Sequence, residues 1–449
     1  MNKERIKSII LALLVIVNLM LAEKILVNKK LWPSGYNFFN MRNTVKKNDY
    51  SVTGHLAVPE KIIINTGYQS SRFEYLRNSK DFSDIFSSAS DVIKKAFQSP
   101  LKAVTTVTSD SWYSALTAKS IYLSYPCRYS APIFASLSGL SSTELNLESF
   151  QDIVISENGN VYISDKNGTV FYKIDVFADS ISPIIKAVAD EHSDEESVIN
   201  YSFDLNFDKN LGEQKTILSP MIPVYSGPVL AEAILSFNPA IKDGEFNHKI
   251  ISNILTAFSI NPNTLRRHTE ADGSMVFVEN NGILKISPDG VLTFTATGTG
   301  INLSGTVTYD TGSNLSKIAE FIDNVNAAIG TDIDMCVTSP LVSNDESNFT
   351  FDYIANGLPV KFSDKSAVTA TVKDGYIKEY TQILRRYIGL GIIQETPLYI
   401  ESLDAIIAQY QTSMNEISIT KMLPAYLDDL TIGQKSPDWF IGIDNVVAQ

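Results

Sequence analysis

Cysteine is almost absent from this chain. The 449 residues include two cysteines, Cys127 and Cys336, which lie far apart in the sequence and belong to no C-x-x-C motif. A disulfide-scaffolded fold is therefore excluded, while two free thiols or a single disulfide both stay open. In an exported protein, cysteine this sparse is typical of a bacterial envelope rather than of a disulfide-rich secretory setting.

Histidine and the usual catalytic motifs are also scarce. The four histidines, His55, His192, His248 and His268, include no pair at the i, i+4 spacing of zinc ligands on a helix. Neither a G-x-S-x-G elbow nor a phosphate-binding glycine motif occurs, and the nearest serine motif, around Ser136, is predicted to be a turn. We therefore expect no enzyme activity, no cofactor and no metal site.

Carboxylates lack the arrangement of a calcium loop. Asp332 and Asp334 form a D-x-D pair that would share one face of a strand, but the glycine and distal glutamate of an EF-hand are absent. We expect both to be exposed to solvent. His192 lies within the acidic run of residues 190–196, which we interpret as a hydrated linker rather than a cation site.

Positive charge is the minority charge. The chain has 37 Lys and Arg against 50 Asp and Glu, and its formal net charge is −13. This balance disfavours nucleic acid, because phosphate binding needs clustered basic residues. The basic groups Arg266-Arg267-His268 and Arg385-Arg386 are predicted to lie on the solvated surface, with contact to an acidic partner as the alternative.

The chain begins with a basic segment that is followed by an apolar run. Lys3, Arg5 and Lys7 precede an uncharged, largely apolar run, residues 8–22. It is short for a span of about 20 residues, and residues 25–27 extend it. The run predicts a single transmembrane helix with a cytoplasmic N-terminus and the bulk of the chain outside the cell membrane. A cleaved signal peptide is the alternative, although the small residue three positions before a cleavage site is missing.

The remaining sequence predicts an α+β fold of antiparallel β-meanders packed with helices. Asn-Gly and Asp-Gly pairs join short apolar runs, as expected of tight hairpins. Helical spacing predicts helices at 82–97, after Asp110, at 314–328 and after Ser402. Extended segments are predicted at 104–107, 121–125, 153–174, 201–207, 275–296, 349–376, 416–427 and 439–443, with Pro126 ending the second of these. In the 314–328 helix, Asn326 is placed on the polar face.

Charged and glycine-rich segments divide the chain into four predicted parts. A cytoplasmic end and anchor at 1–30 precede an N-terminal α+β domain at 31–195, a central α+β domain at 196–300 and a C-terminal α+β domain at 301–449. The acidic run at 190–196 and the glycines near residue 300 mark the two later boundaries.

Three segments resemble the YycH family, also called WalH, of low-GC Gram-positive bacteria. They are residues 1–9, the stretch 270–290 with its Glu270-Ala271-Asp272-Gly273 and Ser287-Pro288-Asp289-Gly290 turns, and the closing residues 437–441. The resemblance implies an extracytoplasmic regulator of the WalK/WalR (YycG/YycF) two-component system, beside the WalK sensor histidine kinase and the related single-pass protein YycI. It further implies a C-terminal domain similar to the YycI ectodomain, and no catalytic residues.

The resemblance implies that the membrane helix contacts the kinase helices. Helices in lipid associate through close packing and interhelical polar groups, so the residues expected to make this contact are Ser8, Ala12 and Asn18. A hydrated Asn18 at the outer interface is the alternative. Two other function classes stay open: an anchored envelope protein that binds a wall fragment or peptide, and a hydrolase that uses Ser136 and His268.

Overall fold

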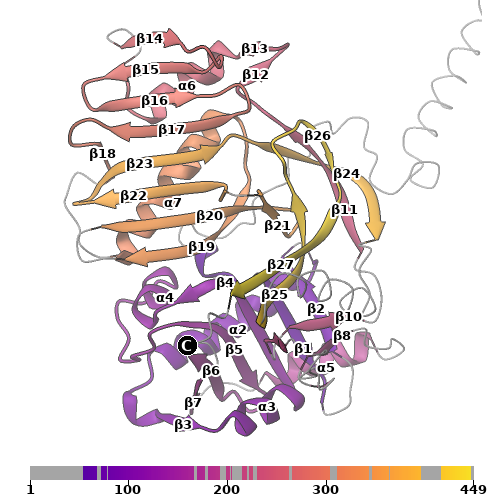
Figure 1. Cartoon of the computed structure of the whole chain (residues 1–449). Coiled ribbons are helices and arrows are strands. Elements are labelled where there is room, and N and C mark those ends of the chain that lie inside the picture. The colour runs from indigo at the N-terminus through magenta and orange to yellow at the C-terminus, as the bar shows by residue number, and fades with distance from the viewer. Residues whose placement is uncertain are drawn as a thin grey trace, which may run out of the picture.

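The computed structural model in Figure 1 is an assembly of two sheet-based parts. The structure describes residues 54–67, 72–77, 79–165, 169–176, 181–192, 199–202, 204, 215–219, 222–225, 230–261, 265–303, 311–342, 346–363, 365–395 and 416–445. The predicted anchor, with Ser8, Ala12 and Asn18, lies outside these residues, as does the helix predicted after Ser402. Within the described ranges, no helix has both the length and the apolar character needed to cross a bilayer.

The first part is built on a seven-stranded antiparallel sheet with the order β2-β1-β4-β5-β6-β7-β3. Its strands are β1 (Lys61–Asn65), β2 (Arg72–Leu76), β3 (Val104–Val107), β4 (Ser120–Tyr129), β5 (Phe150–Ser156), β6 (Val161–Asp165) and β7 (Val170–Ile174). Its helices are α2 (Phe82–Phe97), α3 (Ser109–Thr117), α4 (Ala131–Leu137) and α5 (Ser182–Glu191), with short 3-10 turns at Gly54–Ala57 and Leu101–Ala103.

Helix α2 shows why this part folds as predicted. Its buried residues recur at helical spacing from Phe82 to Phe97, so one face is apolar and packs on the sheet. Phe97 meets the rings of Phe134 and Phe150 at centroid distances of 4.9 and 5.6 Å. These aromatic contacts join α2, α4 and β5 into one core layer.

The second part contains a larger sheet, seen in pink, orange and yellow in Figure 1. Its main path is β14-β15-β16-β17-β23-β22-β20-β21-β25-β27, and β18, β19 and β9 pair beside it. The strands are β9 (Lys215–Leu218), β14 (Arg266–Thr269), β15 (Met275–Glu279), β16 (Gly282–Ile286), β17 (Val291–Ala296), β18 (Ile301–Asn302), β19 (Asp334–Val342), β20 (Ser347–Ala355), β21 (Leu358–Lys361), β22 (Val368–Lys373), β23 (Tyr376–Ile383), β25 (Glu416–Leu427) and β27 (Pro437–Asn445). All pairings are antiparallel except those of β25 with β21 and β9.

Smaller elements complete the second part. A three-stranded sheet has the order β24-β11-β26, formed by β11 (Leu230–Phe237), β24 (Arg386–Glu395) and β26 (Gly433–Lys435). Two short pairs are β8 (Ile199–Tyr201) with β10 (Pro223–Tyr225), and β12 (Ile241–Lys242) with β13 (Glu245–Phe246). Helices α6 (His248–Ala257) and α7 (Thr311–Ala328) lie together behind the large sheet in Figure 1.

The mixed α+β class and the predicted hairpins are confirmed. Asn356-Gly357 joins β20 to β21 and Asp374-Gly375 joins β22 to β23, and all four residues have positive φ angles of 44°, 77°, 54° and 77°. Such angles are the conformation that Asn-Gly and Asp-Gly adopt most readily. The sequence pattern therefore identified these turns because they need residues that readily adopt a positive φ angle.

Three sequence predictions need correction. Strand β4 continues through Pro126 to Tyr129, because its ladder with β5 is irregular between Ser124 and Tyr129 and needs no N–H from the proline. The segment around Ser136 is the last turn of helix α4, and the predicted turn begins only after it, at Ser138 and Gly139. Asn326 is buried on α7, not on its polar face, because its side-chain oxygen accepts a hydrogen bond from Gln382 at 2.8 Å.

The predicted domain boundaries stay predictions, and the structure adds two facts about them. Strands β17 and β23, on either side of residue 300, are hydrogen-bonded neighbours in the large sheet. Strand β4 packs against β19, and α4 packs against α7, so that one hydrophobic core runs through both sheet-based parts.

Candidate functional site

Ser136 and His268, the candidate catalytic residues, do not lie together. Ser136 lies on α4 in the first part, whereas His268 lies on β14, at the far end of the large sheet in Figure 1. His248 is exposed at the start of α6. No group of three metal-binding side chains occurs among the residues that the structure describes.

His192 packs against the first sheet, in contrast to the hydrated linker predicted for it. Its ring stacks on Phe73 at 4.3 Å between centroids, and its Nε2 lies 3.4 Å from the hydroxyl of Tyr75. The acidic run begins inside helix α5, which ends at Glu191. The aromatic stacking partner comes from β2, a strand far away in sequence.

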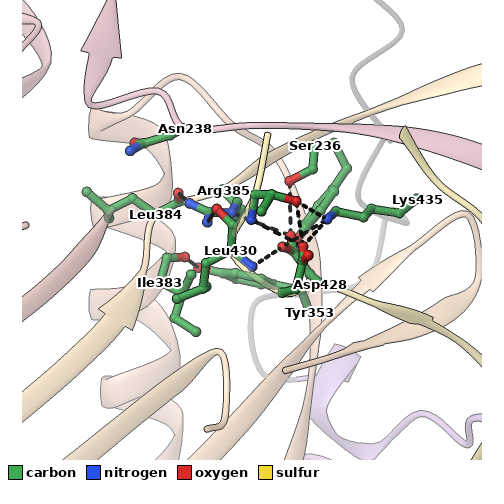
Figure 2. Close-up of polar contacts among 12 residues, drawn as sticks. Ser236, Asn238, Tyr353, Ile383, Leu384, Arg385, Asp428, Leu430 and Lys435 are labelled. Atoms are coloured by element: carbon green, nitrogen blue, oxygen red, sulfur yellow. Dashed lines mark hydrogen bonds and ion pairs between the residues drawn. The ribbon is translucent and has the colours of Figure 1, made fainter. Parts of the chain in front are cut away.

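The most concentrated polar site is a buried cluster around Asp428, which we call the Asp428 cluster: Ser236, Arg385, Tyr387, Asp428 and Lys435. The side chains of Arg385 and Asp428 are 0% exposed, and Arg385 Nε lies 3.4 Å from Asp428 Oδ2. Lys435 Nζ lies 3.8 Å from Asp428 Oδ1. In Figure 2 the side chains of Ser236, Arg385 and Lys435 gather around the carboxylate of Asp428.

Neutral groups complete the coordination of this carboxylate. Asp428 Oδ2 accepts hydrogen bonds from the hydroxyls of Ser236 at 2.9 Å and Tyr387 at 2.8 Å, and Oδ1 accepts one from Leu430 N at 2.9 Å. Burial and the Asp428 charge raise the pKa of Tyr387 well above its usual value. Tyr387 therefore stays protonated and donates to Asp428, so the cluster stores no reactive phenolate.

The guanidinium of Arg385 also holds a turn of the large sheet. Its Nη1 donates to Asp289 O at 2.9 Å and its Nη2 to Leu430 O at 2.7 Å. A Cβ on Gly290, whose φ is +89°, would lie 2.8 Å from Arg385 Nη1. The cluster therefore joins the turn between β16 and β17 to the three-stranded sheet, and its role is structural.

The predicted surface position of Arg385 is wrong. The basic pair Arg385-Arg386 stands at the crossing from β23 to β24, where the chain leaves the large sheet for the small one. Its carboxylate partner is more than forty residues later in the chain. Local sequence contains no signal for that contact.

A second set of ion pairs, one buried and one half-buried, lies where the two sheet-based parts meet. Arg77, which follows β2, lies 3.4 Å from Asp334 at the start of β19, and their side chains are 1% and 4% exposed. Lys421 of β25 pairs with Glu60 at 2.8 Å. Asp334 is thus buried, contrary to prediction, while its neighbour Asp332 is exposed as predicted.

Both cysteines lie at the same junction. Cys127 on β4 and Cys336 on β19 are free and buried, which resolves the choice that the sequence left open. Burial raises the pKa of Cys127 to about 12 and that of Cys336 to about 11. Neither thiol is ionised at neutral pH, so neither is set up as a nucleophile.

A groove of about 280 Å³ lies between α2 and α4. It is lined by serines and two charged residues of α2 and by aromatic side chains: Ser83, Ser87, Ser90, Asp91, Lys94, Phe86, Tyr125 and Phe134. Tyr125 is fully buried, and its hydroxyl has no hydrogen-bond partner within the part of the chain that the structure describes. Its serine hydroxyls, charged groups and aromatic side chains make this groove a candidate ligand site.

The chain resembles a known protein in its structure but matches none by sequence. No protein-family model matches the chain, and no curated protein sequence matches it. Among solved structures, the crystal structure of YycH from Bacillus subtilis is similar, with a TM-score of 0.60 and 13% sequence identity, over 89% of this chain and 97% of that chain. The chain has the YycH fold.

The resemblance read from the sequence is therefore confirmed for the fold. The 270–290 stretch forms β15, β16 and the turns beside them, and its Pro288-Asp289-Gly290 turn is held by Arg385 and by Asn238, whose Nδ2 donates to Pro288 O at 2.9 Å. The closing residues 437–441 lie on β27, which pairs with β25. At 13% identity the YycH fold assigns no role to single residues. The YycI-like character of the C-terminal domain stays a prediction.

Proposed function

We propose that this chain is a membrane-anchored extracytoplasmic regulator of the YycH type, which modulates a WalK-like sensor histidine kinase controlling cell-wall metabolism. The observation that carries the proposal is the extent of the fold match, which covers 89% of this chain and 97% of YycH. A match over nearly all of both chains relates whole proteins, whereas a shared small module would leave most of each chain unmatched.

The proposed contact with the kinase is made in the membrane, by the helix that residues 8–22 predict. An amide such as Asn18 seeks a hydrogen-bond partner in hydrocarbon, and bonds of this kind contribute roughly 1–2 kcal/mol in model helices. A regulator shifts a kinase only by binding its two states with different affinity. A difference of about 1.4 kcal/mol changes that equilibrium tenfold.

The body of the protein supplies a rigid platform outside the membrane in this proposal. The buried ion pair Arg77–Asp334 and the half-buried pair Lys421–Glu60 tie the two sheet-based parts together. A partner that binds one part would then also affect the position of the other. A YycI-like single-pass protein is the second proposed partner.

The test replaces the anchor in the full-length protein and measures kinase output in the native host. We expect an unrelated single-pass helix to abolish most of the regulatory effect, and Asn18→Leu to weaken association with the kinase. Asn18→Gln is the matched control, because it keeps an amide in the helix. Unchanged kinase output after the anchor swap would eliminate the membrane-helix mechanism.

A second candidate function rests on the groove between α2 and α4. The serine hydroxyls and aromatic side chains that line the groove suit a small polar ligand such as a wall fragment or peptide. Binding to the native state raises thermal stability. Stabilisation of the full-length protein in detergent by soluble wall fragments, lost in Ser87→Leu, would favour this function; no stabilisation by any fragment would remove it.

A further inference from the structure

Strand β14 forms the outer edge of the large sheet. Its four residues, Arg266 to Thr269, pair with β15 on one side, and no described strand pairs with the other side. All four side chains are exposed. Figure 1 places β14 at the outer end of the sheet. An edge of this kind presents unpaired backbone groups, which a further strand can use.

The register shows which backbone groups are free. Glu270 N donates to Ser274 O at 2.9 Å, which makes this a hydrogen-bonded pair next to the hairpin turn. Hydrogen-bonded and non-hydrogen-bonded pairs alternate along an antiparallel ladder, so His268 and Arg266 bond to β15. The N–H and C=O groups of Arg267 and Thr269 therefore point away from β15.

The side chains on this edge are basic on both faces of the sheet. Arg266 and His268 share a face with their partners Val278 and Val276, and Arg267 lies on the other face, opposite Phe277. Ile283, which pairs with Val278 and is 38% exposed, continues the first face. An incoming strand would thus meet cations on either face and an apolar side chain two strands further in.

Charge selects the kind of strand that this edge accepts. Arg266, Arg267 and His268 form no ion pair in the described part of the chain, whereas the nearby Glu270 and Asp272 are held by Lys285 at 2.6 and 3.1 Å. Two copies of this edge would place like charges opposite each other, which is unfavourable. The rest of the chain is acidic, with a net charge of −13 overall, so this basic edge is exceptional on it.

We propose that β14 is a docking edge for an extended acidic segment of a partner protein, which joins the large sheet as an additional strand. Backbone pairing to Arg267 and Thr269 supplies the affinity, and the cations of Arg266 and Arg267 select carboxylates on the incoming strand. This inference goes beyond the proposed function, because it requires neither the membrane helix nor a kinase.

The test uses full-length protein in detergent micelles and a labelled peptide of alternating Glu and Val, about seven residues long, close to the usual length of a strand. Fluorescence anisotropy measures binding, and the same peptide with Lys in place of Glu is the control. We expect binding of the Glu peptide alone, weakening at high salt, and protection of the Arg267 and Thr269 amides from hydrogen exchange.

Two variants separate charge from backbone pairing. Arg266→Glu/Arg267→Glu reverses the charge, and Thr269→Pro removes an outward N–H without removing a bond to β15. Each should weaken the Glu peptide at least tenfold while leaving the urea midpoint of unfolding near that of the wild type. No binding of the Glu peptide, equal binding of the Lys peptide, full binding by Thr269→Pro, or self-association through this edge would each overturn the proposal.

Discussion

The two arginine pairs of this chain look alike in sequence, yet they occupy opposite environments. Arg266 and Arg267 lie on an outer strand, exposed and without an ion pair in the described structure. Arg385 is 0% exposed and is bound by Asp428, Asp289 O and Leu430 O. The difference lies in what the fold brings near each pair, and it separates a residue that stabilises the protein from residues free to meet a partner.

Loss of the Arg385 charge should have the largest effect. Arg385→Met leaves the Asp428 carboxylate buried with only Lys435, at 3.8 Å, as a cation. Breaking a buried ion pair costs about 3–5 kcal/mol, and urea unfolding measures this cost. Arg267→Met, on the exposed strand, should change stability by less than about 0.5 kcal/mol. An equal loss of unfolding free energy in the two variants would show that Arg385 and Arg267 do not differ in their contribution to stability.

A double variant sharpens this result. In Arg385→Met/Asp428→Leu, both charges are gone, and replacement of a buried pair by apolar residues can be nearly neutral. We expect the double variant to be more stable than Arg385→Met alone. If instead the two losses add, the cost comes from the hydrogen bonds to Asp289 O and Leu430 O rather than from the unpaired carboxylate.

Removal of Arg77 should have the next largest effect. Arg77→Met leaves Asp334 without its buried cation and removes a hydrogen bond to Val58 O at 2.7 Å. The expected loss is about 3 kcal/mol. Because the pair joins the two parts, unfolding followed by tryptophan fluorescence and by circular dichroism should no longer coincide. Coincident curves at wild-type stability would contradict the coupling role.

Gly290 tests the contact of Arg385 with the turn before β17. Gly290→Ala puts a Cβ 2.8 Å from Arg385 Nη1 at a φ of +89°, which should cost about 1–3 kcal/mol. Gly139→Ala is the matched control, since its φ is +78° and nothing lies within 4 Å of the new Cβ. A thermal melt that shows equal losses for both variants would mean that the backbone angle alone matters.

The smallest effect belongs to the exposed pair of Asp272 and Lys285. The backbone N–H of Ser274 and then Lys285 lower the pKa of Asp272 to about 2. A lowered carboxyl pKa adds stability above the unfolded-state pKa of about 3.9, and this stability disappears as the pH falls toward 2. The urea midpoint of Asp272→Asn should therefore lie slightly below that of the wild type at pH 6 and match it at pH 2. A gap that does not change with pH would refute the charge effect.

The sequence predicted the elements whose signal is local. Helix α2 has the predicted bounds, Phe82–Phe97, because its apolar residues repeat at helical spacing, and the Asn-Gly and Asp-Gly turns were identified for the same kind of reason. Burial of Arg385, Asp334 and Asn326 was missed, because each is satisfied by a partner distant in the chain. The predicted contact residues Ser8, Ala12 and Asn18 lie outside the described structure and stay a prediction.

Contact between the anchored protein and a sensor kinase can be detected by in-membrane crosslinking in the native host. The full-length protein and a version that lacks residues 1–30, exported by a cleavable signal, would be crosslinked and purified in parallel. We expect a histidine kinase to be recovered with the anchored form and to be lost without the anchor. Recovery of wall fragments or unrelated proteins, with no kinase from either form, would contradict it.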